Sequence, residues 1–157
     1  MAWGNHVCDV GVVATPRHPP FAVTEMWNKP YPAFVFGSNL SGKHGAGAAR
    51  LAREWRGAQN GIGEGATGDA YAIPTKDHEL HTLPLPRIRA AVDTFLQYAG
   101  AHPEIPFQIT RIGCGLAGYS DTEIAPFFDS VPANSYLPGV WLQHGQPSLL
   151  RVIVTGG

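Results

Sequence analysis

The stretch from Phe34 to Arg50 constrains the fold of this 157-residue chain more than any other segment. An apolar run from Ala33 to Phe36 predicts a buried strand, and three glycines lead from it into a segment, Ala46 to Trp55, with helical spacing of its apolar residues. Such a turn collects free backbone N–H groups and the positive end of the helix dipole. It favours either phosphate binding or a tight connection in which small residues allow close packing. The apolar face of the helix is expected to contain Ala48, Leu51, Ala52 and Trp55.

Composition limits the class of protein. The length suits one domain with its own core. A formal net charge of −1 argues against a general nucleic-acid binder that depends on a basic surface, but it leaves a single nucleotide ligand open. Cys8 and Cys114 form no disulfide framework or zinc pattern, so we expect a reducing, cytoplasmic setting without metal or cofactor. No apolar run reaches the ~18 residues of a membrane span, so no membrane partner is expected.

The remaining elements alternate between strand and helix. Residues 1–32 are expected to form an irregular arm, because prolines interrupt them; the arm wraps the domain or covers a ligand. Within it, 10–14 predicts a short strand and 24–27 one helical turn. Helices are predicted at 85–101 and 122–129 after a glycine-rich loop at 57–68, and strands at 69–74, 107–112, 140–142 and 150–154.

This alternation predicts an α/β fold, a three-layer α/β/α mixed sheet. Ligands of such sheets bind at the carboxyl ends of the strands. Two glycine loops, the first at 42–47 and the second at 113–118, are expected at that edge together with the tip at Thr75, Lys76 and Asp77.

The run from Gly37 to Lys43 nearly matches a nucleoside-triphosphate loop. His44 occupies the position where that motif needs Ser or Thr to hold magnesium. Residues 70–73, within the predicted strand at 69–74, and the predicted strand at 107–112 carry no carboxylate to hold the metal, so we do not expect an NTPase.

Three motifs in order resemble the macrodomain family of ADP-ribose-binding proteins. The first, at 39–49, has the form Asn-x-x-Gly-x-x-Gly-x-Gly-x-Ala; the second is Ile-Pro-Thr-Lys at 73–76; the third is Arg-Ile-Gly-Cys-Gly-Leu at 111–116. The branch they most resemble contains the terminal ADP-ribose glycohydrolase and the antitoxin that removes ADP-ribose from DNA. The resemblance covers about residues 33 to 130 and implies a macrodomain-like domain at 33–142 that binds ADP-ribose or ADP-ribosylated protein, DNA or metabolites.

The resemblance also implies roles. The turn at 42–47 would bind the diphosphate, the loop at 113–118 would close over its other side, and Asn39 would bind the distal ribose. Lys76 would attack or assist at the anomeric carbon, unless it is a solvated lysine or a point charge for phosphate. His44 would add positive charge or point to solvent, and Cys114 is expected to be a small buried residue. The implied ligand-binding residues are Asn39, Gly42, His44, Gly45, Ala46, Gly47, Thr75, Gly113, Cys114, Gly115, Leu116, Ala117, Gly118 and Tyr119.

One departure affects the implied hydrolysis. Ala117 occupies the position where the human-type glycohydrolase has its acid–base aspartate. Asp121 either replaces that residue or caps the helix that Ser120 would otherwise cap, and Asp77 with His78 are further candidate proton carriers. Lys76 therefore favours a hydrolase, and Ala117 favours a reader that binds without turnover.

The segment 143–157 raises a separate expectation. An apolar strand runs into Thr155, Gly156 and Gly157, which resembles the opening of the SLOG family of domains that bind nucleotide-derived ligands. This implies a linker and the start of a fused nucleotide-binding domain; the alternative is a final edge strand.

Overall fold

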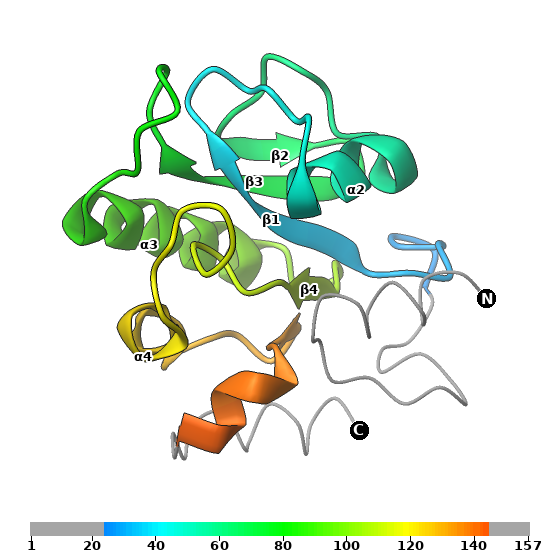
Figure 1. The fold of residues 1–157 in the computed structure, drawn as a ribbon. Helices are drawn as coiled ribbons and strands as arrows, with labels where there is room; N and C mark the ends of the chain where they lie inside the picture. The colour runs from blue at the N-terminus through cyan, green and yellow to red at the C-terminus, as the bar shows by residue number, and fades with distance from the viewer. Residues whose placement is uncertain (1–23, 145–157) are drawn as a thin grey trace.

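Strand β1 (Ala33–Asn39) is the central strand of a five-stranded mixed sheet in the computed structural model of the protein (Figure 1). It pairs in parallel with β3 (Ala70–Lys76) on one side and with β4 (Phe107–Ile109) on the other. The outer strands are β5 (Ser135–Tyr136), parallel to β4, and β2 (Gly65–Thr67), antiparallel to β3. The carboxyl ends of β1, β3 and β4 therefore meet at one edge.

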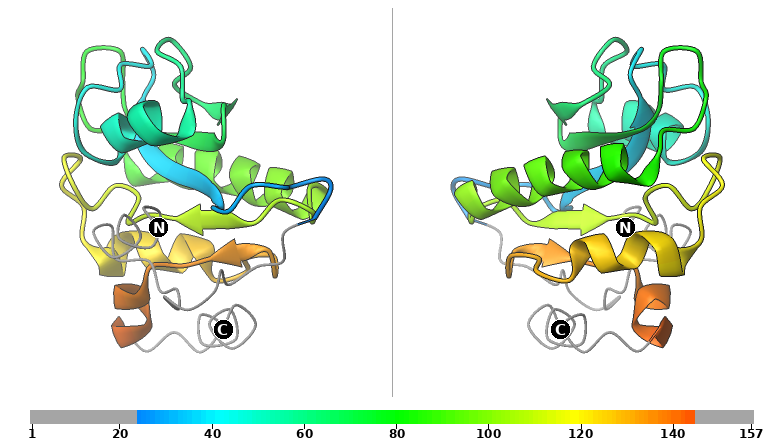
Figure 2. Two further views of the ribbon diagram at one scale, coloured as in Figure 1. Left: turned by 90° about the vertical axis from the view of Figure 1, so that its right-hand side faces the viewer. Right: turned by 90° about the vertical axis from the view of Figure 1, so that its left-hand side faces the viewer.

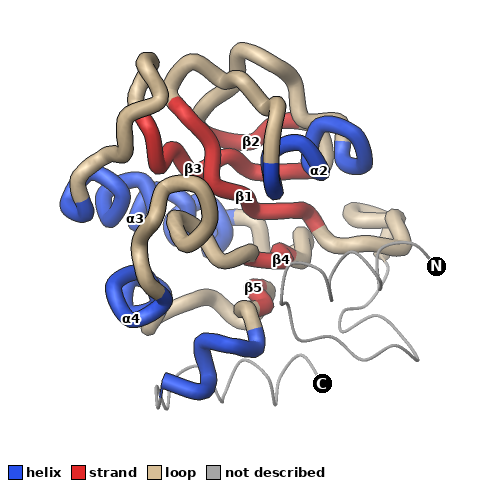
Figure 3. The backbone as a smooth tube through the Cα atoms, viewed as in Figure 1, coloured by secondary structure: helices blue, strands red, loops and turns tan. Residues whose placement is uncertain are grey.

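The sheet is covered by helices on both faces, as Figures 2 and 3 show. Side chains alternate along β1, so Phe34 and Phe36 face α2 (Gly47–Arg56) while Val35 faces the core under α3 (Leu85–Ala101). The predicted three-layer α/β/α mixed sheet is confirmed.

Helix α3 has the bounds that its apolar spacing predicts. Ile88, Val92, Phe95 and Ala99 are fully buried, and the ring of Phe95 contacts Tyr71 edge-on at 4.9 Å between centroids. Such contacts join the helix to the sheet through its largest apolar side chains. Neither α3 nor another helix within residues 24–144 combines the length and hydrophobicity of a membrane-spanning helix.

The structure describes residues 24–144. The strands predicted at 10–14 and 150–154, and most of the arm and of the segment 143–157, lie outside these residues. The helical turn predicted at 24–27 is wrong. Thr24 Oγ1 accepts a hydrogen bond from the Trp27 N–H at 3.1 Å, which stabilises a bend instead.

The end of the described chain differs from the sequence prediction. The segment 140–142 is not a strand but part of the 3-10 helix η2 (Gly139–His144), and the last strand of the sheet is β5. Trp141 explains the difference, because its buried ring packs on Phe128 at 5.2 Å between centroids and its indole N–H donates to Asp121. Trp141 is buried by these two contacts and not by the alternation of side chains along a strand, so the strand pattern predicted the wrong element here.

Two helices are also corrected in detail. The predicted helix at 122–129 divides into α4 (Asp121–Ile124) and the 3-10 helix η1 (Ala125–Phe128), since Pro126 cannot donate a backbone hydrogen bond. On α2, Trp55 is 52% exposed, whereas Arg56 is buried with its guanidinium 4.1 Å from the centroid of the Tyr31 ring. The cationic side chain covers the aromatic face at the amino end of the sheet.

The first glycine loop gives a test of the fold. Gly42 has φ +71°, and a Cβ there would lie 2.5 Å from the backbone carbon of Gly61. We expect Gly42→Ala to lower the free energy of unfolding by about 2 kcal/mol or more, measured by urea denaturation. Gly45 is the control, because a Cβ there meets nothing within 4 Å. Gly45→Ala is expected to change stability by less than about 0.5 kcal/mol; equal losses for both variants would contradict this packing.

Candidate functional site

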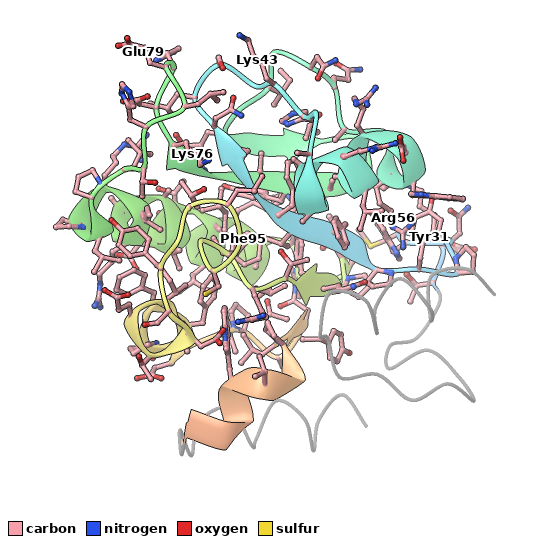
Figure 4. The ribbon with its side chains drawn as sticks, in the orientation of Figure 1. Tyr31, Lys43, Arg56, Lys76, Glu79 and Phe95 are labelled. Carbon is pink, nitrogen blue, oxygen red and sulfur yellow. The ribbon has the colours of Figure 1, made fainter. Side chains whose placement is uncertain are left out.

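The carboxyl ends of β1, β3 and β4 open into a cleft of about 760 Å³. Its walls come from three segments. These are the first glycine loop (42–47) with the start of α2, the second glycine loop (113–118) after β4, and the hairpin after β3 (77–83). Figure 4 shows Lys43 and Lys76 at this edge, whereas Tyr31 and Arg56 lie together at the opposite edge. The cleft is lined by Gly37, Ser38, Asn39, Lys43, Gly45, Ala46, Gly47, Ala48, Ala49, Thr75, Lys76, Leu80, Thr110, Arg111, Gly113, Cys114, Gly115, Leu116, Ala117 and Val140.

Asn39 shapes the first wall. Its Oδ1 accepts hydrogen bonds from the Lys43 N–H at 2.9 Å and from Ser41 Oγ at 2.8 Å, and its Nδ2 donates to the Lys43 carbonyl at 2.8 Å. The amide therefore closes the loop between β1 and α2. One Nδ2 hydrogen is left for a ligand, because an amide nitrogen carries two.

His44 supports the same loop from behind. Its side chain is buried, its Nε2 lies 3.0 Å from the Ile62 carbonyl oxygen, and its ring contacts Phe36 edge-on. Its backbone N–H donates to Asn60 Oδ1 and its carbonyl accepts from Arg53 Nε. The alternative that His44 points to solvent is wrong, and the side chain does not line the cleft.

The amino end of α2 faces the cleft without a cap. The N-cap residue is Ala46, which has no side-chain acceptor, and the first turn of α2 carries no acidic residue. Among the residues that the structure describes, the leading amides of α2 thus lack both intrahelical and capping partners. Together with the helix dipole they form an anion-binding surface along Gly45 to Ala49, all of which line the cleft.

The second glycine loop forms the facing wall. Gly113 has φ +76°, and the Tyr119 N–H donates to the Gly113 carbonyl at 2.9 Å, which folds the loop back on itself. The Tyr119 hydroxyl donates to the Leu83 carbonyl at 2.7 Å, and Thr82 Oγ1 donates to the Ala117 carbonyl at 3.0 Å. These bonds connect the loop to the hairpin after β3, so the two elements form one continuous rim.

The charged residues of the cleft are all cationic. Lys43, Lys76 and Arg111 line it, and none of its described lining residues is Asp or Glu. Within residues 24–144 the structure shows no ion pair for the ammonium groups of Lys43 and Lys76. The cleft therefore presents uncompensated positive charge beside free backbone amides, which suits a multiply charged anion.

Arg111 is held by Asp121. Its Nε and Nη2 donate to the two carboxylate oxygens at 2.9 and 2.7 Å, and the Trp141 indole N–H adds a third bond at 2.7 Å. The Arg111 bonds, followed by the Trp141 bond, lower the pKa of Asp121, and the Asp121 bonds raise the pKa of Arg111. Asp121 does not line the cleft, and Ser120, not Asp121, caps α4 in a capping box with Glu123. The Asp121 carboxylate therefore positions the Arg111 guanidinium.

Asp77 is engaged in a turn. Its Oδ1 accepts the N–H groups of Glu79 and His81, each at 2.9 Å, and these bonds, that of His81 first, lower the pKa of Asp77. The carboxylate does not line the cleft. The ionised Asp77 carboxylate accepts the two backbone hydrogen bonds that hold the turn, so its role in this structure is to stabilise the turn.

Cys114 lines the cleft as a half-buried thiol. Burial first, and then the charge of Asp121, raise the pKa of Cys114 to about 12. The group stays protonated at neutral pH and is a poor nucleophile.

The structure brings together most of the predicted site. Of the predicted residues, Asn39, Gly45, Ala46, Gly47, Thr75, Lys76, Gly113, Cys114, Gly115, Leu116 and Ala117 line the cleft, while Gly42, His44, Gly118, Tyr119, Asp77 and Asp121 do not. The sequence prediction did not include the other lining residues, which are Gly37, Ser38, Lys43, Ala48, Ala49, Leu80, Thr110, Arg111 and Val140. Lys43 and Arg111 lie inside the quoted motifs and their charge was a usable signal, whereas nothing in the sequence marks Leu80 or Val140.

Comparisons of the chain with family models, with curated proteins and with solved structures give no match. Among the residues that the structure describes, no group of three or more His, Cys, Asp or Glu side chains could hold a metal ion. The chemistry of the cleft is therefore interpreted from its own amides, cations and shape.

The Asp121 network predicts a pH-dependent stability. A carboxyl whose pKa is lowered on folding stabilises the protein above its unfolded pKa of about 3.9, and this contribution is lost as the pH falls through the folded value. We expect Asp121→Asn to destabilise the protein by on the order of 1 kcal/mol at pH 7. The difference from the wild type should shrink at about pH 3.

Urea denaturation at both pH values measures this difference. Asp93→Asn serves as the control, because Asp93 is exposed on α3. A difference between wild type and Asp121→Asn that does not change with pH would contradict the ion pair.

Proposed function

We propose that the cleft binds the ADP-ribosyl group, with the diphosphate between the two glycine loops. The observation that carries this proposal is the uncapped amino end of α2 facing the second glycine loop across a cleft whose charged residues are cations. A diphosphate needs several N–H donors and positive charge at close range, and this arrangement offers both.

The size and surface of the cleft support a ligand of this kind. A volume of about 760 Å³ is typical of clefts that bury a small organic molecule. At Gly45 and Gly115, one on each wall, a Cβ would meet nothing within 4 Å, so the backbone is open on the cleft side. Phosphate oxygens can therefore reach the amides of both loops without a side chain between them.

The sequence motifs add an independent argument. The three motifs that resemble the macrodomain family all contribute lining residues to the cleft, from the loop after β1, the end of β3 and the loop after β4. We therefore propose that the chain is a macrodomain-like protein whose partners are ADP-ribosylated proteins, nucleic acids or metabolites. A cytoplasmic location is part of the same proposal and rests on the sparse cysteines.

Hydrolysis of the ADP-ribosyl linkage is the activity that Lys76 favours. The Lys76 ammonium lies at the end of β3, lines the cleft and forms no ion pair within residues 24–144, which supports a role at the sugar beside the diphosphate. Once it loses its proton, the Lys76 amine would form a bond to the anomeric carbon as the bond from that carbon to the substrate's carboxylate or base breaks and that group leaves. Water would then displace the amine, which releases ADP-ribose and restores the lysine.

A reader without turnover is the second candidate. Asp77 and Asp121, the two carboxylates predicted as proton carriers, are engaged in hydrogen bonds and lie outside the lining of the cleft. Ala117 lines the cleft where the resembled enzymes have an acid. A site that binds the ligand but lacks an acid–base group would hold ADP-ribose without releasing it from its substrate.

Binding is tested by calorimetry with ADP-ribose. The Gly45→Val variant places a branched side chain in the open space where the diphosphate would lie, so we expect at least about a tenfold loss of affinity with the fold retained. Gly100→Val, on α3 and outside the cleft lining, controls for the substitution itself. Unchanged affinity in Gly45→Val would contradict this location for the diphosphate.

Turnover separates the two candidates. For a hydrolase, Lys76→Ala should abolish release of ADP-ribose from modified DNA or protein and change ADP-ribose affinity by less than about tenfold. Lys43→Ala removes another cleft cation and is expected to weaken binding while turnover at saturating substrate persists. If the wild type binds ADP-ribose tightly but releases none from either substrate, the hydrolase is ruled out and the protein is a reader.

A further inference from the structure

The hairpin after β3 brings a leucine to the rim of the cleft. The Leu83 N–H donates to the Thr75 carbonyl and the Asp77 N–H to the His81 carbonyl, each at 2.8 Å, so the chain folds back on itself directly after Lys76. The tip projects beyond the sheet edge, as the position of Glu79 in Figure 4 shows. Leu80, on this hairpin, and Lys76, at the end of β3, both line the cleft.

Leu80 has an unusual backbone at this tip. With φ +67°, it is the one non-glycine residue in the left-handed region among residues 24–144. This conformation costs free energy for a leucine, whereas glycine or asparagine adopts it readily. Its side chain is 47% exposed and lines the cleft, so burial in the core does not explain the choice of an apolar residue.

The surrounding bonds impose the conformation. Asp77 Oδ1 accepts from the backbone of Glu79 and of His81, and the Leu80 N–H donates to the Asp77 carbonyl at 3.1 Å. The strain at Leu80 is thus maintained by hydrogen bonds that its own backbone and its neighbours make with Asp77. Strain maintained in this way at a cleft indicates a functional side chain.

We propose that Leu80 is a specificity-determining residue that covers the apolar face of the distal ribose of bound ADP-ribose. This inference rests on the proposed function and adds the residue that distinguishes ADP-ribose from ADP. Leu80 and Lys76 line the same cleft, and in this proposal the sugar beside Lys76 also contacts Leu80. The bond from Thr82 Oγ1 to the Ala117 carbonyl fixes the hairpin against the second glycine loop, which closes the rim over the same sugar.

The test compares ADP-ribose with ADP, which lacks the distal ribose, by calorimetry on wild type and Leu80→Asn. Asparagine suits the left-handed backbone, so the melting temperature should stay the same or rise. Loss of the apolar contact should weaken ADP-ribose binding about tenfold and change ADP binding by less than about twofold. Leu80→Met, which keeps the apolar bulk, should retain most of the ADP-ribose affinity.

The controls distinguish a failure of the role of Leu80 from a failure of the proposed ADP-ribose binding. Met26→Asn makes the same kind of change at a residue 72% exposed and outside the cleft lining, and should leave both affinities unchanged. If the wild type binds neither ligand, the proposed function fails and this inference fails with it. If the wild type binds both ligands and Leu80→Asn weakens neither, or weakens both equally, only the role of Leu80 is overturned. A melting temperature several degrees lower in Leu80→Asn would assign Leu80 to packing and overturn it as well.

Discussion

The parallel pairing of β1 with β3 and with β4 is the constraint on which the cleft depends. It brings three connections that are far apart in sequence to one edge of the sheet, and each delivers a different chemical group. The loop after β1 delivers the uncapped amides of α2, the end of β3 delivers an ammonium, and the loop after β4 delivers a second glycine backbone with an arginine. An antiparallel partner for β1 would send one of these groups to the far edge.

Polar side chains around this edge are used mainly to hold its loops. Asn39 closes the first loop, His44 and Arg53 support it from behind, and Asp121 holds Arg111 through two bonds. Because these bonds fix the walls in advance, a ligand would meet donors that need little reordering, which favours affinity. The same use of carboxylates leaves Lys76 without an acid beside it in the cleft lining, and this is the structural basis for considering a reader beside a hydrolase.

Much of the fold follows from local sequence patterns, and the parts that do not have physical reasons. The bounds of α3 follow from its 3.6-residue period, and β1 and β3 follow from apolar runs bounded by proline and glycine, although both extend further than predicted. The role of Trp141 in η2 was not predictable, because it depends on Phe128 and on Asp121, which are distant in sequence. For the site, glycine spacing located both loops. It could not show that His44 is buried or that Leu80 turns toward the cleft, since both depend on hydrogen bonds formed only in the folded chain.

A crystal structure with ADP-ribose would show directly whether the two glycine loops hold the diphosphate. We expect density for the diphosphate between the amino end of α2 and the second glycine loop, within hydrogen-bond distance of the amides on both sides. The ribose beyond it should lie beside Lys76. Ligand density at another surface, or a diphosphate that contacts only one of the two loops, would contradict binding of the diphosphate between them.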